Sequence, residues 1–165
     1  MASGTPIASI GVKIGYKAVS KSNKPSTVDW TTGTTAFTRI YDIKSTPDFN
    51  TQPNTADATT FDNLTYTTSV ELLKDIGGAL EFSANLTSDF KTAWASVCTD
   101  AADATKGNGG VWFGITIPGI AQSIMFYGKP SALGLPALSA NTLAETSVYV
   151  TPITEPEWVN TTNPV

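Results

Sequence analysis

The chain has 165 residues, a mass of 17.3 kDa and a net charge of −4, with hydrophobic residues at 41% and charged residues at only 15%. This length fits one ordinary domain, and the low charge is typical of a protein that has an uncharged polar surface or buries much of its surface against partners. Histidine is absent and Cys98 is the single cysteine, which excludes an internal disulfide, a multi-thiolate metal site and most histidine-dependent catalysis.

The charges are unevenly distributed along the chain. The first 44 residues carry six basic and two acidic side chains, a net charge of +4, whereas the remainder carries −8. The isoelectric point near 4.6 means that the chain is negatively charged at neutral pH, which disfavours binding to phosphate backbones. A basic section on an acidic body favours head-to-tail self-association, although a scatter without functional meaning fits the charges equally well.

No basic segment followed by an apolar one opens the chain, and no run approaches the ~18 apolar residues of a membrane helix. We therefore expect synthesis in the cytoplasm and no membrane anchor.

Apolar residues alternating with a period of two predict strands along most of the chain. In the segment from Gln122 to Tyr127 both faces are apolar, which indicates burial on two sides or against a neighbouring subunit. The predicted strands cover residues 8–17, 37–43, 80–86, 111–117, 122–127 and 142–153.

One segment has helical periodicity instead and predicts an α-helix over about residues 88–104. Thr87 or Ser88 is a suitable N-cap, and Gly107 a suitable stop. The helix should lie on the sheet through an apolar stripe of Phe90, Trp94, Val97, Cys98 and Ala101.

Three polar segments fit poorly into one small domain. A long loop at about residues 45–60 contains Phe49 as its only large apolar residue, residues 20–35 surround Trp30, and the tail from Pro152 holds Trp158. Unstructured connections longer than ~12–15 residues are usually functional or disordered.

Candidate catalytic groups are few. Ser88 and Lys91 match a Ser-x-x-Lys spacing without its companion elements, and Cys98 lies on the apolar stripe of the helix, where it is expected to pack as a small core residue. The residues therefore predict a protein that is not an enzyme, with no catalytic, cofactor or metal site. Three tryptophans, Trp30, Trp112 and Trp158, could form a sugar-stacking platform or mark a protein interface.

A more specific pattern occupies residues 111–151. It consists of Trp-Phe-Gly-Ile-Thr-Ile-Pro-Gly (112–119), Phe-Tyr-Gly-Lys-Pro-Ser (126–131), Leu-Gly-Leu-Pro (133–136) and Glu-Thr-Ser-Val-Tyr-Val-Thr (145–151), with Thr-Pro-Asp-Phe (46–49) and Thr-Thr-Phe-Asp (59–62) upstream. This pattern of packing and turn residues resembles the major tail proteins, the tail-tube subunits of long, non-contractile bacteriophage tails.

The resemblance implies an all-β fold with one flanking α-helix, a β-sandwich or flattened barrel that assembles into hexameric rings. Residues 1–165 would form one tail-tube domain with an N-terminal arm (about 1–6), the long loop (about 45–60) and a C-terminal arm (about 153–165). Rings would stack into a hollow tube in the virion, assembled in the host cytoplasm. Duplex DNA would pass through without sequence-specific binding, and the implied partners are further copies of the chain, a tape-measure protein, a tail terminator and a distal tail protein.

The same resemblance assigns the loop and arms to contacts between subunits. Glu81 and Asn85, on the polar face of one predicted strand, are candidate lumen-facing residues. The candidate interface residues are Thr46, Pro47, Asp48, Phe49, Asn50, Pro53, Asn54, Trp158 and Val159.

Alternatives remain open at this point. A related secretion or ejection tube, or a head–tail completion protein, would need similar strands but different partners. A monomeric carbohydrate-binding β-sandwich would use Trp30 or Trp158. A hydrolase would need a cleft with perturbed carboxylates.

Overall fold

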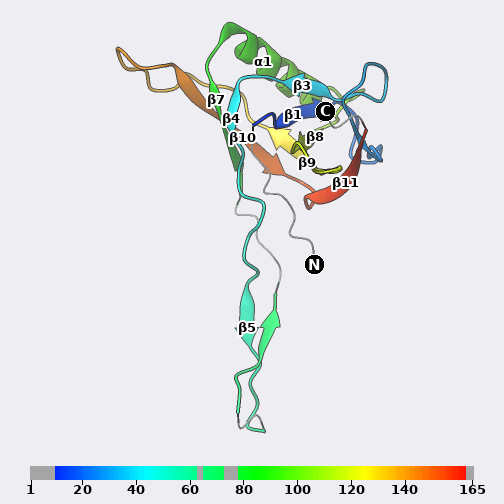
Figure 1. Ribbon diagram of the computed structural model, residues 1–165, viewed down its shortest axis with the longest axis vertical. Coiled ribbons are helices and arrows are strands. Elements are labelled where there is room, and N and C mark those ends of the chain that lie inside the picture. Colours follow the sequence, from blue (N-terminus) through cyan, green and yellow to red (C-terminus); the bar gives the residue numbers. More distant parts are fainter. Residues whose placement is uncertain (1–9, 63–64, 73–77, 163–165) are drawn as a thin grey trace.

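The computed structural model describes residues 10–62, 65–72 and 78–162, and it consists of a sheet-and-helix body from which a long two-stranded arm projects (Figure 1). The expected N-terminal arm at residues 1–6 lies outside the described residues. The strands are β1 (Lys13–Lys17), β2 (Val28–Asp29), β3 (Thr38–Ile40), β4 (Ile43–Ser45), β5 (Thr55–Asp57), β6 (Ser69–Glu71), β7 (Leu80–Asn85), β8 (Val111–Thr116), β9 (Gln122–Pro130), β10 (Glu145–Pro152) and β11 (Glu157–Thr162).

One sheet of nine strands forms the body: seven follow the order β3-β1-β8-β9-β10-β7-β4, and β11, which pairs with β9 and β2, lies off this path together with β2. The central strand β9 pairs with β8 along one edge, while β11 and β10 share its other edge at residues 122–125 and 128–130. β3 and β4 lie at the two ends of this order, yet only two residues separate them in the chain. The sheet is therefore curled, and its two ends lie close together where β3 passes into β4. The predicted all-β fold with one helix is confirmed.

The predicted helix is α1 (Ser88–Ala102), with Thr87 as its N-cap: the Thr87 hydroxyl accepts a hydrogen bond from the Phe90 N–H at 3.0 Å. The buried residues are those of the predicted stripe, except that Cys98 is only half-buried. Trp94 is buried, and its indole N–H donates to the Ser131 carbonyl at 2.8 Å. The helix ends two residues earlier than predicted.

Both faces of the central strands are covered by the chain itself. All six residues of β8 are buried. One face joins a large cluster beneath α1 that includes Phe113 and Phe126, and the other face joins a smaller cluster. The smaller cluster is Val28, Phe37, Trp112, Met125, Tyr127 and Val159, with Val19 and Trp30 against it. The two-sided burial predicted for residues 122–127 therefore arises within one chain and needs no neighbouring subunit.

The single strand predicted at residues 37–43 is wrong. Asp42 has a φ of 67°, in the left-handed region, and it separates β3 from β4. Tyr41 is 63% exposed and lies against the guanidinium of Arg39, whose carbon is 4.7 Å from the ring centroid. The break sends the chain from one end of the sheet to the other, because β3 pairs with β1 and β4 pairs with β7.

Two further boundaries differ from the prediction. The strand predicted at 8–17 is shorter in the structure, since β1 begins at Lys13 and Ile10 is 86% exposed. The C-terminal arm predicted from residue 153 is wrong over Glu157–Thr162, because these residues form β11, antiparallel to β9 and parallel to β2.

Candidate assembly surface

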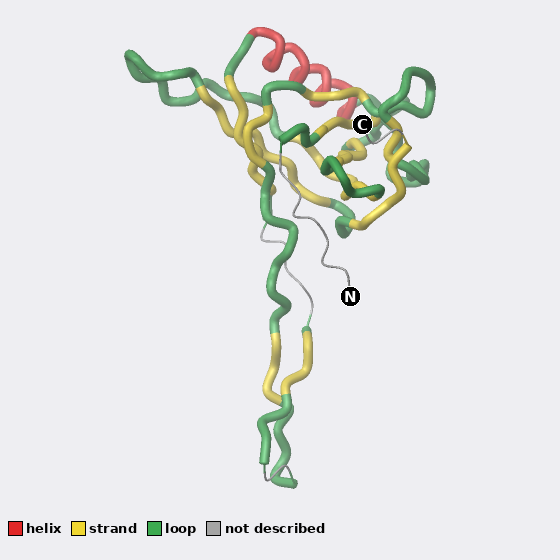
Figure 2. The backbone as a smooth tube through the Cα atoms, in the orientation of Figure 1, coloured by secondary structure: helices red, strands yellow, loops and turns green. Residues whose placement is uncertain are grey.

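The segment predicted as a long loop is one side of a β-hairpin that extends away from the body (Figure 2). Its strand β5 pairs antiparallel with β6, which lies beyond the predicted loop, in the register Thr55 with Glu71 and Asp57 with Ser69. We call residues 50–72, as far as they are described, the arm. The projecting segment therefore extends beyond the predicted loop of 45–60, and part of that predicted loop is a strand.

Backbone and side-chain hydrogen bonds hold the arm together. The Leu72 N–H donates to the Asn54 carbonyl at 2.6 Å, and the Ala58 N–H to the Thr68 carbonyl at 2.8 Å. The Asp57 carboxylate accepts hydrogen bonds from the hydroxyl and the backbone N–H of Thr59, which lower the pKa of that carboxyl. Polar contacts of this kind fix the register, but they bury no apolar surface.

All six strand residues of the arm are exposed. An isolated two-stranded hairpin is marginally stable in water, since it has no hydrophobic face packed on anything. The described arm also carries acidic side chains and no basic one. Its large exposed apolar residues are Phe61 (104%), Tyr66 (80%), Val70 (50%) and Leu72 (50%). Such a surface gains stability when a partner covers it.

The residues at the base of the arm divide between body and solvent. Phe49, predicted as an interface residue, is half-buried and packs on the body core, with its ring centroid 5.5 Å from that of Phe126. The Asp48 carboxylate accepts a hydrogen bond from the Asn50 N–H at 2.7 Å and forms a tight turn. Thr46 and Asn54 are exposed, while Pro47 and Pro53 are half-buried.

The C-terminal interface residues also separate. Val159 is buried in the smaller cluster of its own chain, at 9% exposure, which leaves little of its side chain for a contact with another subunit. Trp158, its neighbour on the opposite face of β11, is 51% exposed. A role for Trp158 between subunits stays a prediction.

The candidate lumen residues lie on the outer face of β7, where the predicted alternation is confirmed by the burial of Leu80, Phe82 and Ala84. Glu81 is exposed opposite Tyr149 of β10. Asn85 is half-buried, and its side-chain oxygen has no hydrogen-bond partner among the described residues.

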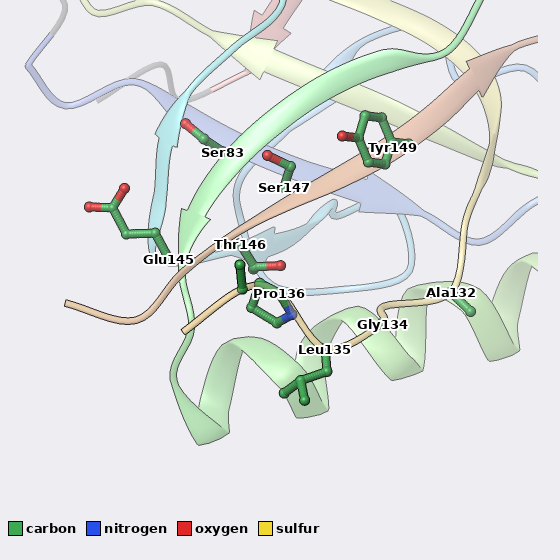
Figure 3. Close-up of a pocket in the computed structure, with 10 residues that line it drawn as sticks. Ser83, Ala132, Gly134, Leu135, Pro136, Glu145, Thr146, Ser147 and Tyr149 are labelled. Carbon is green, nitrogen blue, oxygen red and sulfur yellow. The ribbon is translucent and has the colours of Figure 1, made fainter. Parts of the chain in front are cut away.

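A cavity of about 510 Å³ lies on this outer face, between β10 and the loop that precedes it. Figure 3 shows the hydroxyl-bearing side chains of Ser83, Ser147 and Tyr149 along the strands, with Pro136 of the loop below them and the Leu135 side chain directed away from the strands. The Glu145 carboxylate at one end pairs with Lys44 of β4. This face is polar and mixed in charge, because it also carries Lys129, which lies opposite Thr151 of β10.

The groups that could carry chemistry are separate from one another. Among residues 10–62, 65–72 and 78–162, no three acidic, cysteine or histidine side chains gather as a metal site. Ser88 and Lys91 are both exposed. Burial raises the pKa of the Cys98 thiol, which keeps it protonated and a poor nucleophile. Burial and the neighbouring Asp100 carboxylate raise the pKa of Tyr16 to about 12.

The three tryptophans do not form a platform. Trp112 is buried and donates its indole N–H to the Ser20 carbonyl at 3.2 Å. Trp30 is half-buried, with its indole N–H on the Thr116 hydroxyl at 2.7 Å. Only Trp158 presents its ring to solvent, so a platform of all three residues is excluded.

Over the described part of the chain, no helix has the length and apolar character needed to cross a membrane. Comparison with protein-family models gives no match for this chain, and comparison with curated proteins gives none either.

Proposed function

We propose that the protein is a structural, self-assembling subunit of a bacteriophage tail tube, and not an enzyme. The arm carries this proposal: it is a hydrogen-bonded ribbon with a fixed register, no core of its own and four exposed large apolar side chains. A ribbon of this kind is stabilised when a partner covers its apolar residues. In a tube, the neighbouring copies of the same chain would be those partners.

The body supports the same proposal. Its sheet ends at β3 and β4, whose outer edges have no strand paired to them among the described residues. Open sheet edges promote uncontrolled association unless closed symmetry pairs or covers them. Six copies in a ring would cover these edges, and stacked rings would place each arm against the next ring.

The outer face of β7 and β10 supports the part of the proposal that concerns DNA. A lumen through which duplex DNA slides must not bind phosphate, because each phosphate neutralised by a basic side chain adds to affinity. Glu81 and Tyr149 make this face polar, and of its two lysines, Lys44 is neutralised by Glu145 while Lys129 lies opposite Thr151 at the other end of β10. In this proposal the tube belongs to the virion, holds a tape-measure protein before ejection, and is closed by terminator and distal tail proteins.

Assembly of the purified protein tests the proposal directly. Light scattering and negative-stain microscopy over a concentration series should show rings or tubes. Replacing residues 55–71 by two glycines joins Asn54 to Leu72, which are already hydrogen-bonded across the arm. This variant should keep the unfolding midpoint of the wild type and lose tubes. As a control, Tyr41→Ser removes an exposed aromatic from the body and should assemble normally. A wild-type particle of 17.3 kDa at every concentration would refute the proposal.

A charge reversal tests the lumen. Glu81→Lys should leave tubes intact but make them retain duplex DNA on sedimentation, with retention lost at high salt. Glu155→Lys is the matched control, since Glu155 is exposed in the turn between β10 and β11. Equal retention by the two variants would show that Glu81 does not face the passage.

A further inference from the structure

A second apolar protrusion leaves the body in a direction different from that of the arm. Residues 131–144 connect β9 to β10 without regular structure, and we call them the leucine loop. In Figure 1 the arm extends downward, while this loop extends to the left beside α1. Leu133 packs on the core, but Leu135 is 85%, Leu138 57% and Leu143 81% exposed.

The leucine loop contains no charged residue in 14 positions, where the chain's average of 15% would place about two. Depletion of charge around exposed apolar side chains is typical of the centre of a protein interface and not of a solvated loop. Three exposed leucines within one uncharged segment are more than the single, scattered apolar residues that are usual on the surface of a monomer. The loop therefore has the composition of a contact surface.

A complementary surface lies elsewhere on the same chain. A cavity of about 730 Å³ opens between β1, β4 and the turn from β8 to β9. We call it the apolar groove. Among the described residues that line it, Lys44 alone is charged, and its side chain is paired with Glu145. The apolar side chains that line the groove without being fully buried are Val12, Ile43, Phe49, Ile117, Ile120 and Ile124.

No residue of the leucine loop lines the groove of its own chain. An uncharged apolar protrusion and an uncharged apolar groove at different places on one molecule define a heterologous contact, which closes into a ring when its rotation permits. We propose that the leucine loop of each copy docks in the apolar groove of the next copy and makes the contact within a ring, while the arm makes the contact between rings. This inference rests on the proposed function, because it names the surfaces through which that assembly forms.

Cross-linking between differently labelled chains tests the contact. In a Cys98→Ser background, Leu138→Cys chains are mixed with Ile120→Cys chains and treated with a short bis-maleimide. The mixture should give at least five times more covalent dimer than either chain alone. Thr34→Cys replaces Ile120→Cys as the control, since Thr34 is exposed and does not line the groove. A dimer yield no greater than that of the control would overturn the proposal.

A mixing experiment separates this contact from other modes of association. The triple variant L135S/L138S/L143S lacks the protrusion, and Ile120→Asp places a charge in the groove. Each variant alone should form no rings. An equimolar mixture should form two-chain particles, because only one competent loop and one competent groove then meet. Unchanged circular dichroism and unfolding midpoints establish that both variants fold. Rings from the triple variant alone would refute the contact.

The two proposals fail in different ways. If the wild type forms rings or tubes while the cross-link stays at control level, the docking of the leucine loop is wrong and the tube function stands. If the wild type stays a single chain at all concentrations, the tube function is wrong. The variant without residues 55–71 should still form single rings, since its leucine loop and groove are intact.

Discussion

The body and the arm are built on opposite principles. In the body, both faces of β8 and β9 are covered, and the two clusters contain nearly all of the buried apolar side chains. In the arm, no strand residue is buried, and the order comes from a few hydrogen bonds and one Asp57–Thr59 turn. Burial of apolar surface dominates folding stability, whereas exposed hydrogen bonds contribute little net free energy. The body can therefore fold alone, while the arm depends on what it contacts.

The largest effect should come from the centre of the body. Trp94→Ala removes a buried indole beneath α1 and its hydrogen bond to Ser131, and it should lower the free energy of unfolding by about 3–5 kcal/mol. Urea unfolding measures this change. Trp158→Ala, at a half-exposed ring, is the matched control and should change stability much less. Equal effects of the two substitutions would mean that the helix does not pack on the sheet as described.

The stability of the fold should depend on pH through Asp29, at the end of β2, and the loop that follows it. The Asp29 carboxylate accepts hydrogen bonds from the Thr31 N–H, the Thr31 hydroxyl and the Thr35 hydroxyl at 2.7–2.9 Å, and these bonds lower the pKa of that carboxyl. Its pKa is near 3.9 in the unfolded chain. The stabilisation is therefore fully present above about pH 4 and is lost as the pH falls through the lower folded value.

Unfolding midpoints measured from pH 6 to pH 2.5 test this dependence. Asp29→Asn should be less stable than the wild type at pH 6, and the difference should shrink toward pH 2.5. Thr35→Ala should lose part of the stabilisation, while Thr34→Ala at the neighbouring exposed position should lose none. A difference between wild type and Asp29→Asn that stays constant with pH would contradict this assignment.

The smallest effect on folding should come from the arm. Phe61→Ser and Tyr66→Ser alter exposed side chains, so the free energy of unfolding of the unassembled chain should change by less than about 0.5 kcal/mol. Tube formation should nevertheless require a higher protein concentration, because these rings are the surface that a neighbouring copy covers. Tubes that form at the wild-type concentration would remove these two residues from the contact.

Sequence patterns predicted those elements in which one face is buried by the chain itself. In β7, buried Leu80, Phe82 and Ala84 alternate with Glu81, Ser83 and Asn85, so the period of two is visible in the residues. The stripe of α1 is visible for the same reason. The hairpin of the arm was not predicted, because an element with no buried face has no apolar periodicity from which to predict it.

Other features were decided only by tertiary structure. β11 follows Pro156 and has a short, mixed pattern, and it becomes a strand because the edge of β9 beside residues 122–125 is free to pair with it. Phe49 looked like an isolated aromatic in a polar loop, yet the curl of the sheet brings Phe126 against it. The left-handed backbone of Asp42 interrupts what looks in the sequence like one continuous strand, and the chain crosses from one end of the sheet to the other at this point.

The amino-acid sequence by itself determined the all-β class, the position of the helix and the absence of histidine chemistry, because these depend on composition and local periodicity. Tertiary structure decided the pairing of distant strands, which placed Val159 in the core, left Trp158 outside and separated the arm from the leucine loop. Pairing depends on which strand edges meet in space, and that information is spread over the whole chain instead of residing in any one segment.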